Sequence, residues 1–163
     1  MIELETARLR LVAYTAAMAR AEVGELERLV DAAVPGEWLE GDIHAVLPLY
    51  AARAAADPAE LGFGPWLVVE RASRTVVGDA GFLGKPGADG TIELGYRIIS
   101  AYTRRGYGFE AARALVDWAL SQPGVDRIVA GCAPDNAPSI RILEKLGMRR
   151  VGSKRGELRW ELR

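Results

Sequence analysis

The stretch YTRRGYGFEAA, Tyr102–Ala112, says most about how this chain folds and what it binds. Two arginines precede Gly106, a second glycine follows at Gly108, and a helical pattern begins there. The strand-like run TIELGYRII, Thr91–Ile99, comes just before. Glycines let a phosphate approach the backbone, and the free N–H groups of a first helical turn point at such an anion. The layout favours a pyrophosphate site, with an ordinary tight turn as the alternative.

This loop differs from the two common nucleotide-binding signatures. A Walker loop requires Gly-Lys-Ser/Thr after the glycines, and none follows here. The dinucleotide fingerprint requires a third glycine at a fixed offset, which is also missing, and the loop lies late in the chain. A nucleotide-binding module is therefore the disfavoured interpretation.

Length and composition predict one globular domain over residues 1–163. A chain of 163 residues is long enough for one hydrophobic core but not comfortably for two. Half of the residues are apolar and 26% are charged, which is an ordinary balance for a globular protein. No apolar run approaches the ~20 residues of a membrane span, and the acids and arginines of the first residues do not fit a signal peptide. We therefore expect a cytoplasmic protein without a membrane partner.

Charge is unevenly distributed along the chain. Residues 1–99 carry nine Lys and Arg against fifteen Asp and Glu, and residues 100–163 carry twelve against seven. An anionic ligand would favour the C-terminal part and a cationic one the N-terminal part, unless both simply carry solvated surface charge. The net charge of −1 without a basic stripe predicts no nucleic-acid partner. The single cysteine, Cys132, and the lack of a ligand cluster predict no metal site.

Hydrophobic periodicity predicts the order strand, two helices, three strands, helix, strand, helix, two strands. The expected strands are 9–12, 65–72, 75–83, 91–99, 127–132, 148–155 and 157–162, and the expected helices are 16–33, 42–56, 106–120 and 136–146. Short turns join the three central strands, so these should form an antiparallel meander. The strand 127–132 follows a helix and is therefore free to lie parallel to its predecessor. The fold class is α+β, or mixed α/β.

A second motif reads CAPDNAPSIRILEKLGM, Cys132–Met148. Asn136 stands at the mouth of a strand and Ser139 in the first turn of the next helix, where each alone is a plain helix cap. Together with the glycine loop upstream, the motif resembles the GNAT superfamily of acyl-CoA-dependent N-acetyltransferases. The likeness is strongest to the RimJ/RimL branch, which acetylates protein N-termini. The segments LETARLRL, ELGYRI, RRGYGFEAARAL and NAPSIRILEKLGM match that branch in order.

The resemblance implies a fold and a co-substrate. The fold is a twisted, mostly antiparallel sheet of about seven strands, splayed in the middle and flanked by about four helices, with acetyl-CoA in the cleft. The strand 91–99 would pair with the pantetheine arm, and the glycine loop would hold the pyrophosphate. The implied cofactor residues are Tyr96, Arg97, Ile98, Arg104, Arg105, Gly106, Tyr107, Gly108, Phe109, Glu110, Asn136, Ser139 and Arg141. Arg141 would reach the 3′-phosphate or remain a solvated helix arginine.

The resemblance also implies direct attack of a primary amine on the thioester. The acceptor is a protein N-terminus by the strongest likeness, or a small amine by the breadth of the superfamily. Many members place a tyrosine seven residues after the asparagine as general acid; this chain has Leu143 there, and Ser139 is the implied replacement. Homodimers are common in the superfamily, so the resemblance allows a homodimer, whereas the sequence itself leaves the oligomeric state open.

The general base is the least defined part of the predicted mechanism. Glu93 is our candidate, because it lies on the strand 91–99 on the same face as Gly95 and Arg97. A surface or ion-paired carboxylate is the alternative, and an α-amine with a pKa near ~8 needs no side-chain base. Trp38 and Trp66 either line the acceptor pocket or serve packing. The rival function is a CoA-binding sensor or degenerate domain without turnover.

Overall fold

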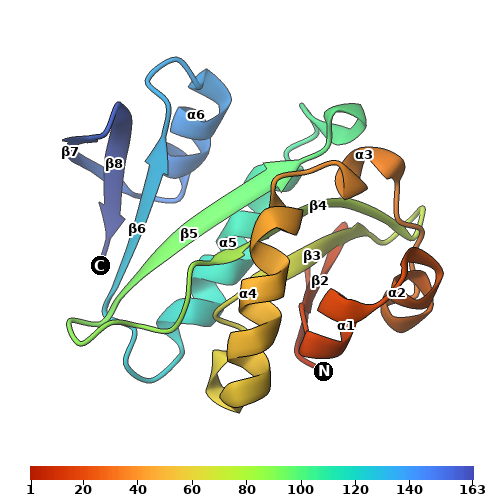
Figure 1. Cartoon of the computed structure of the whole chain (residues 1–163). Helices are drawn as coiled ribbons and strands as arrows, with labels where there is room; N and C mark the ends of the chain where they lie inside the picture. The colour runs from red at the N-terminus through yellow and green to blue at the C-terminus, as the bar shows by residue number, and fades with distance from the viewer.

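The computed structural model describes residues 1–163 and contains one eight-stranded sheet (Figure 1). The strands are β1 (Glu3–Glu5), β2 (Leu9–Ala13), β3 (Pro65–Glu70), β4 (Thr75–Phe82), β5 (Thr91–Ile98), β6 (Arg127–Cys132), β7 (Arg149–Lys154) and β8 (Glu157–Leu162). Their order in the sheet is β1-β2-β3-β4-β5-β6-β8-β7. Only β5 and β6 are parallel, so the predicted mixed fold and its mostly antiparallel sheet are confirmed.

Six α-helices flank the sheet. They are α1 (Ala16–Arg20), α2 (Val23–Val30), α3 (Gly36–Leu39), α4 (Ile43–Ala56), α5 (Tyr107–Leu120) and α6 (Ala137–Lys145). In Figure 1, α1 and α4 lie in front of the sheet and α5 lies behind it. None of these helices has the length and apolar character that crossing a bilayer requires.

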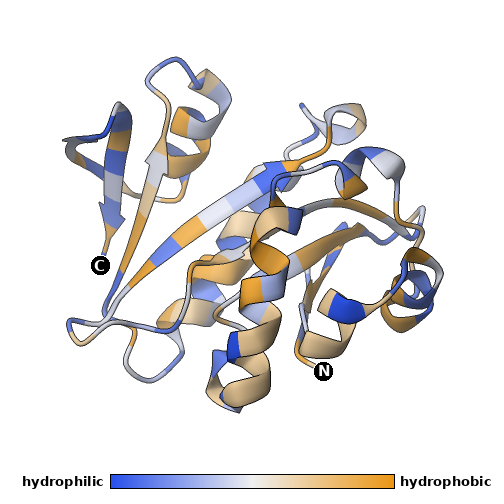
Figure 2. Cartoon of the chain, in the orientation of Figure 1, coloured by the Kyte–Doolittle hydropathy of each residue, from blue (hydrophilic) through white to orange (hydrophobic).

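Two hydrophobic clusters hold these layers together. The larger, of 25 buried residues, joins the sheet to α5 and α6, and the smaller, of 14, joins its other face to α1–α4. Along β3, Trp66 and Val68 enter the larger cluster while Leu67 and Val69 enter the smaller. Because helices cover both faces, this strand is apolar from Trp66 to Val69, and it is largely orange in Figure 2.

The structure corrects three expectations about the elements. The helix expected over 16–33 is two helices, because Ala21 and Glu22 are extended, and the bend lets Met18 and Leu26 enter one cluster. An eighth strand, β1, pairs with β2; its exposed glutamates hide the strand from a hydropathy pattern and suit a sheet edge. The short helix α3 was not predicted either.

The sheet opens between β5 and β6. The two strands pair only from Thr91–Leu94 with Arg127–Ala130, while β5 continues to Ile98 in register with β4. Residues 95–98 therefore have no strand partner on the β6 side. A free strand edge offers unpaired N–H and C=O groups to an extended ligand.

Candidate active site

A groove of about 900 Å³ lies where β5 leaves β6. Its walls come from β5, from the loop that precedes α5, from the first turn of α5 and from one side of α6. The structure brings most of the predicted cofactor residues together here: Tyr96, Arg97, Ile98, Arg104, Gly106, Tyr107, Gly108, Phe109, Asn136, Ser139 and Arg141. Residues from two separate segments of the chain, 96–109 and 136–145, thus form one site.

The groove carries positive charge without compensation. Its charged residues are Arg97, Arg104, Arg141 and Lys145, and no aspartate or glutamate lines it. Arg104, Arg141 and Lys145 form no ion pair within the chain, whereas the guanidinium of Arg97 lies near Gly41 on the α4 side of the sheet. The N-termini of α5 and α6 add the positive ends of two helix dipoles. The groove is therefore built for a polyanion.

Lys145 is a groove residue that the sequence analysis missed. Its ammonium nitrogen lies 4.3 Å from the centre of the Phe109 ring and reaches the groove from the last turn of α6. The sequence contains a signal for this residue, namely its helical spacing. Lys145 follows Arg141 by four residues and so lies on the same face of the helix.

The glycine loop has the conformation that an anion site needs. Arg104 and Gly106 adopt left-handed backbone angles, with φ of 63° and 82°, which turn the chain into α5. Gly106 occupies the N-cap position, and no side chain caps the helix, so its first N–H groups are free. Gly108 has a packing role as well, because a Cβ there would stand 3.0 Å from Ile142 Cδ1.

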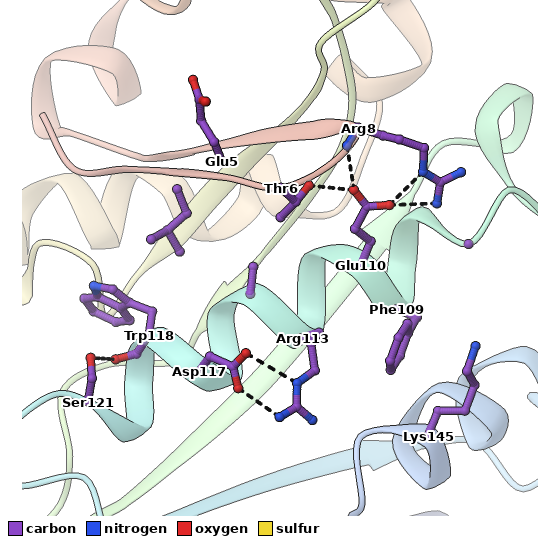
Figure 3. Close-up of a pocket in the computed structure, with 13 residues that line it drawn as sticks. Glu5, Thr6, Arg8, Phe109, Glu110, Arg113, Asp117, Trp118, Ser121 and Lys145 are labelled. Atoms are coloured by element: carbon purple, nitrogen blue, oxygen red, sulfur yellow. Dashed lines mark hydrogen bonds and ion pairs between the residues drawn. The ribbon is translucent and has the colours of Figure 1, made fainter.

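The side chains of Arg105 and Glu110 lie outside the groove, contrary to the expectation. Arg105 stacks over the Tyr102 ring at 4.8 Å and approaches Glu70 at 3.7 Å. Glu110 accepts hydrogen bonds from the Thr6 hydroxyl at 2.6 Å and the Arg8 backbone N–H at 2.9 Å (Figure 3). Burial raises the pKa of Glu110, but these hydrogen bonds outweigh it and hold the pKa below its ordinary value.

Glu110 borders a second, open groove along α5, which Figure 3 shows. Most of its charges are satisfied internally, since Arg8 pairs with Glu110 at 2.7 Å and Arg113 pairs with Asp117 at 2.9 Å. Lys145, which has no ion-pair partner, lines both this groove and the anion groove. These pairs tie α5 to the β1–β2 turn and to itself. The groove along α5 is therefore a structural contact between α5 and the β1–β2 turn. The opening between β5 and β6 remains the candidate anion site.

A tyrosine and a serine meet at the base of the anion groove. The Tyr96 hydroxyl lies 2.7 Å from Ser139 Oγ, while Asn136 Oδ1 accepts from the Ser139 backbone N–H at 3.2 Å and caps α6. Burial raises the pKa of Tyr96, so its phenol keeps its proton. Leu143, where many GNAT members have the acidic tyrosine, is fully buried. In this chain the phenol beside Ser139 therefore comes from Tyr96 on β5, whereas the tyrosine of other members would come from α6.

Glu93 does not lie in the anion groove. Its Oε1 accepts a hydrogen bond from Arg159 at 3.0 Å, and it lines none of the main cavities. The structure favours the ion-paired alternative for this residue over the role of general base.

A second cavity, of about 470 Å³, lies between α4 and the strands β4 and β5. It shares Tyr96 and Arg97 with the anion groove, so the two sites meet at β5. Asp79 lines it and is only 9% exposed. Burial raises the pKa of Asp79 against the lowering effects of the Trp38 hydrogen bond, Arg97 and His44.

The tryptophans that were candidates for an acceptor pocket are packing residues. Trp38 is buried and donates from Nε1 to Asp79 Oδ2 at 2.9 Å, and Trp66 is buried and donates to the Gly62 carbonyl at 2.8 Å. Asp79 itself was missed. Its signal is a lone carboxylate in the apolar run VVGDAGF, Val76–Phe82, where a plain strand was predicted.

Known proteins agree with this architecture. Residues 8–149 match the family described as "Acetyltransferase (GNAT) domain". The chain is 35% identical over 150 residues to the uncharacterized N-acetyltransferase YjdG of Bacillus subtilis, covering 90% of this chain and 89% of that protein. The chain therefore belongs to the GNAT family and is an N-acetyltransferase of that family.

Solved structures share the fold. The ribosomal-protein-S5-alanine acetyltransferase of Vibrio fischeri superposes with a TM-score of 0.72 at 14% identity, covering 99% of this chain and 96% of that one. An acetyltransferase of Agrobacterium tumefaciens superposes with a TM-score of 0.70 at 21% identity, covering 100% and 95%. Both likenesses establish the splayed GNAT sheet.

Proposed function

We propose that this chain transfers an acetyl group from acetyl-CoA to a primary amine and belongs to the RimJ/RimL branch. One observation carries the proposal: the groove at the splayed edge of β5 holds three unpaired cations, Arg104, Arg141 and Lys145, and no carboxylate. The diphosphate and 3′-phosphate of CoA supply matching negative charge, and the amides of its pantetheine arm suit the free edge of residues 95–98.

The reaction is a direct transfer. The amine loses a proton to water, and its nitrogen attacks the thioester carbonyl carbon. The new C–N bond forms as the C–S bond breaks. A backbone N–H of β5 stabilises the developing oxyanion. Ser139 donates a proton to the departing CoA thiolate and recovers one through water from the acetylated nitrogen, which becomes the neutral amide. Tyr96 hydrogen-bonds to Ser139 at 2.7 Å and keeps its hydroxyl oriented.

The acceptor is a protein N-terminus or a small primary amine. The motifs LETARLRL and NAPSIRILEKLGM support the RimJ/RimL branch, and one structural neighbour acetylates a ribosomal-protein alanine by its name. We also infer that residues 1–163 work as one domain, because strands from both ends of the chain join one sheet. Cytoplasmic location and a homodimer stay predictions, and light scattering on the purified chain measures the second.

An acetyl-transfer assay tests the proposed function. The purified chain is mixed with acetyl-CoA and a panel of primary amines, and both free CoA and the mass of the acetylated amine are measured. Amine-dependent release of CoA with a matching acetylated product is the expected result. A chain that binds acetyl-CoA and acetylates no amine or peptide N-terminus would instead be the sensor without turnover.

A further inference from the structure

The cavity between α4, β4 and β5 faces the same strand as the anion groove but from the α4 side. The two sites touch at Tyr96, whose hydroxyl lies beside Ser139. A molecule in this cavity therefore reaches β5 where the thioester is expected.

The mouth of the cavity is apolar and exposed. Val46 and Leu49 of α4 are 47% and 63% exposed, and Leu83, just after β4, is 69% exposed. Ile43 and Phe82 continue the apolar wall. Large apolar side chains gathered at a concave surface favour a ligand with an apolar body.

Asp79 gives this apolar cavity one buried carboxylate. Trp38 donates to Oδ2 at 2.9 Å, whereas Oδ1 has no hydrogen-bond partner in the protein and no cationic side chain forms an ion pair with Asp79. A buried carboxylate without a counter-ion is costly, and a bound cation removes that cost. The cavity thus lacks one positive group.

The other charges of the cavity limit how many cations it binds. Asp42 is exposed, and Arg53 approaches Glu60 at 3.7 Å, while Arg97 belongs to both sites. With Arg53 paired to Glu60, Arg97 alone stands beside the two aspartates, which leaves one negative charge. The cavity therefore suits one ammonium group and rejects a polyamine.

We infer that this cavity binds the acceptor as a single ammonium group attached to an apolar body, with Asp79 as its counter-ion. The inference rests on the proposed function and names its substrate class. Two sources carry this chemistry, a free apolar amine and a peptide whose first residue is apolar, and the experiment separates them.

Gly95 leaves room for this acceptor beside Tyr96. It lines the cavity, and a Cβ at this position would meet nothing within 4 Å. Its φ is not in the left-handed region, so a larger residue causes no backbone strain. A substitution here fills the cavity without disturbing the core.

The first experiment compares acceptors at a fixed, saturating acetyl-CoA concentration. The probes are 2-phenylethylamine, isoamylamine, spermidine and two short peptide amides that begin with Leu or Asp. We expect the apolar amines or the Leu peptide to exceed spermidine and the Asp peptide by about tenfold or more in kcat/KM, as burial of one apolar group predicts. Preference for spermidine or the Asp peptide would overturn the inference.

The second experiment removes the charge of the proposed counter-ion. Asp79→Asn keeps an oxygen that accepts from Trp38 Nε1 but cannot pair with an ammonium group. The KM for the best apolar acceptor should rise about tenfold, with the KM for acetyl-CoA unchanged. Asp126→Asn is the matched control, because Asp126 is exposed and forms no ion pair. An unchanged acceptor KM in Asp79→Asn would remove Asp79 from the binding site.

The third experiment fills the cavity. Gly95→Val should raise the KM for 2-phenylethylamine more than that for methylamine, because only the larger body needs the space. Gly24→Val is its control, since Gly24 also has open space within 4 Å but lies in α2. Equal KM changes for both amines would contradict the inference.

Failure of this inference and failure of the proposed function give different results. Acetyl-CoA binding without binding or acetylation of any apolar amine or Leu peptide, measured by calorimetry and CoA release, overturns the inference. Loss of acetyl-CoA binding itself overturns the proposed function. Acetylation of spermidine alone leaves the proposed function standing and overturns the substrate class.

Discussion

Tyr96 and Ser139 form the contact that the mechanism needs at the residue scale. Ser139→Ala removes the proton donor for the thiolate, so kcat should fall about tenfold or more while acetyl-CoA affinity changes little. Tyr96→Phe removes the hydrogen bond at 2.7 Å and should lower kcat by a smaller factor. Steady-state kinetics with a separate Kd measurement check both. An unchanged kcat in Ser139→Ala would leave the serine only its place in the first turn of α6.

Asp79 predicts an unusual dependence of stability on pH. Because burial raises its pKa in the folded state, the folded chain binds the proton more tightly than the unfolded chain, whose Asp pKa is about 3.9. The contribution of Asp79 to stability should therefore fall as pH rises from about 4 through its folded pKa. The hydrogen bond from Trp38 and the nearby Arg97 and His44 act to lower the pKa of Asp79 and so narrow this window.

The variant Asp79→Asn lacks this titration. Its Tm without ligand should match that of the wild type below pH about 4 and exceed it at pH 7, because no charge is buried. Thermal unfolding of both proteins across that pH range measures the difference. A variant less stable than the wild type at pH 7 would show that the carboxylate is already compensated within the fold.

At this scale the sequence predicted the residues that sit in continuous motifs. Asn136 and Ser139 were found because the motif and helix capping both mark them, and the structure shows the cap. Asp79 and Lys145 were missed because each takes its meaning from a distant partner, Trp38 for the first and Phe109 for the second. No local pattern records such a contact.

At the element scale, Glu110 fixes the start of α5 to the β1–β2 turn. It accepts from Thr6 and Arg8, and Arg8 also donates to the Arg105 carbonyl at 2.7 Å. Glu110→Gln removes charge-assisted hydrogen bonds and should cost about 1.5–3 kcal/mol of unfolding free energy at pH 7. Urea unfolding measures this loss.

The pH dependence of the Glu110 effect follows from its lowered pKa. The stabilisation is complete above the unfolded Glu pKa of about 4.3 and disappears as pH falls through the lower folded pKa. Asp117→Asn on the same helix is the control, and loss of its exposed pair with Arg113 should cost only about 0.5 kcal/mol. Equal losses in the two variants would contradict a special role for Glu110.

Helices whose ends are marked by glycine or proline were predicted well, and helices without such end signals were not. Pro123-Gly124 and Gly147 mark the ends of α5 and α6, and both helices lie where periodicity places them. Between α1 and α2 the chain bends at Ala21, a good helix former, because packing against the sheet outweighs helix propensity there. The position of the bend between α1 and α2 is therefore set by tertiary contacts and not by the local sequence.

At the scale of the whole molecule, charged residues from the two parts of the chain line two different sites. The anion groove gathers cations mainly from residues after 100, whereas Asp42 and Asp79 of the acidic part line the cavity on the α4 side. The charges that line the two sites follow the uneven charge of the sequence, although Arg53 and Arg97 also line the α4-side cavity. The sequence could not place the cavity, because its walls come from α4, β4 and β5, which only the fold brings together.

Calorimetric titration with acetyl-CoA tests the central claim, that the groove at the β5–β6 opening binds this co-substrate. Arg104→Glu reverses a groove charge and should weaken binding about tenfold or more, while Arg155→Glu should bind like the wild type. Arg155 is a matched control, because it is exposed, has a similar φ of 52° and lies in the β7–β8 turn. Equal affinity in the two variants, or no binding by the wild type, would contradict the account.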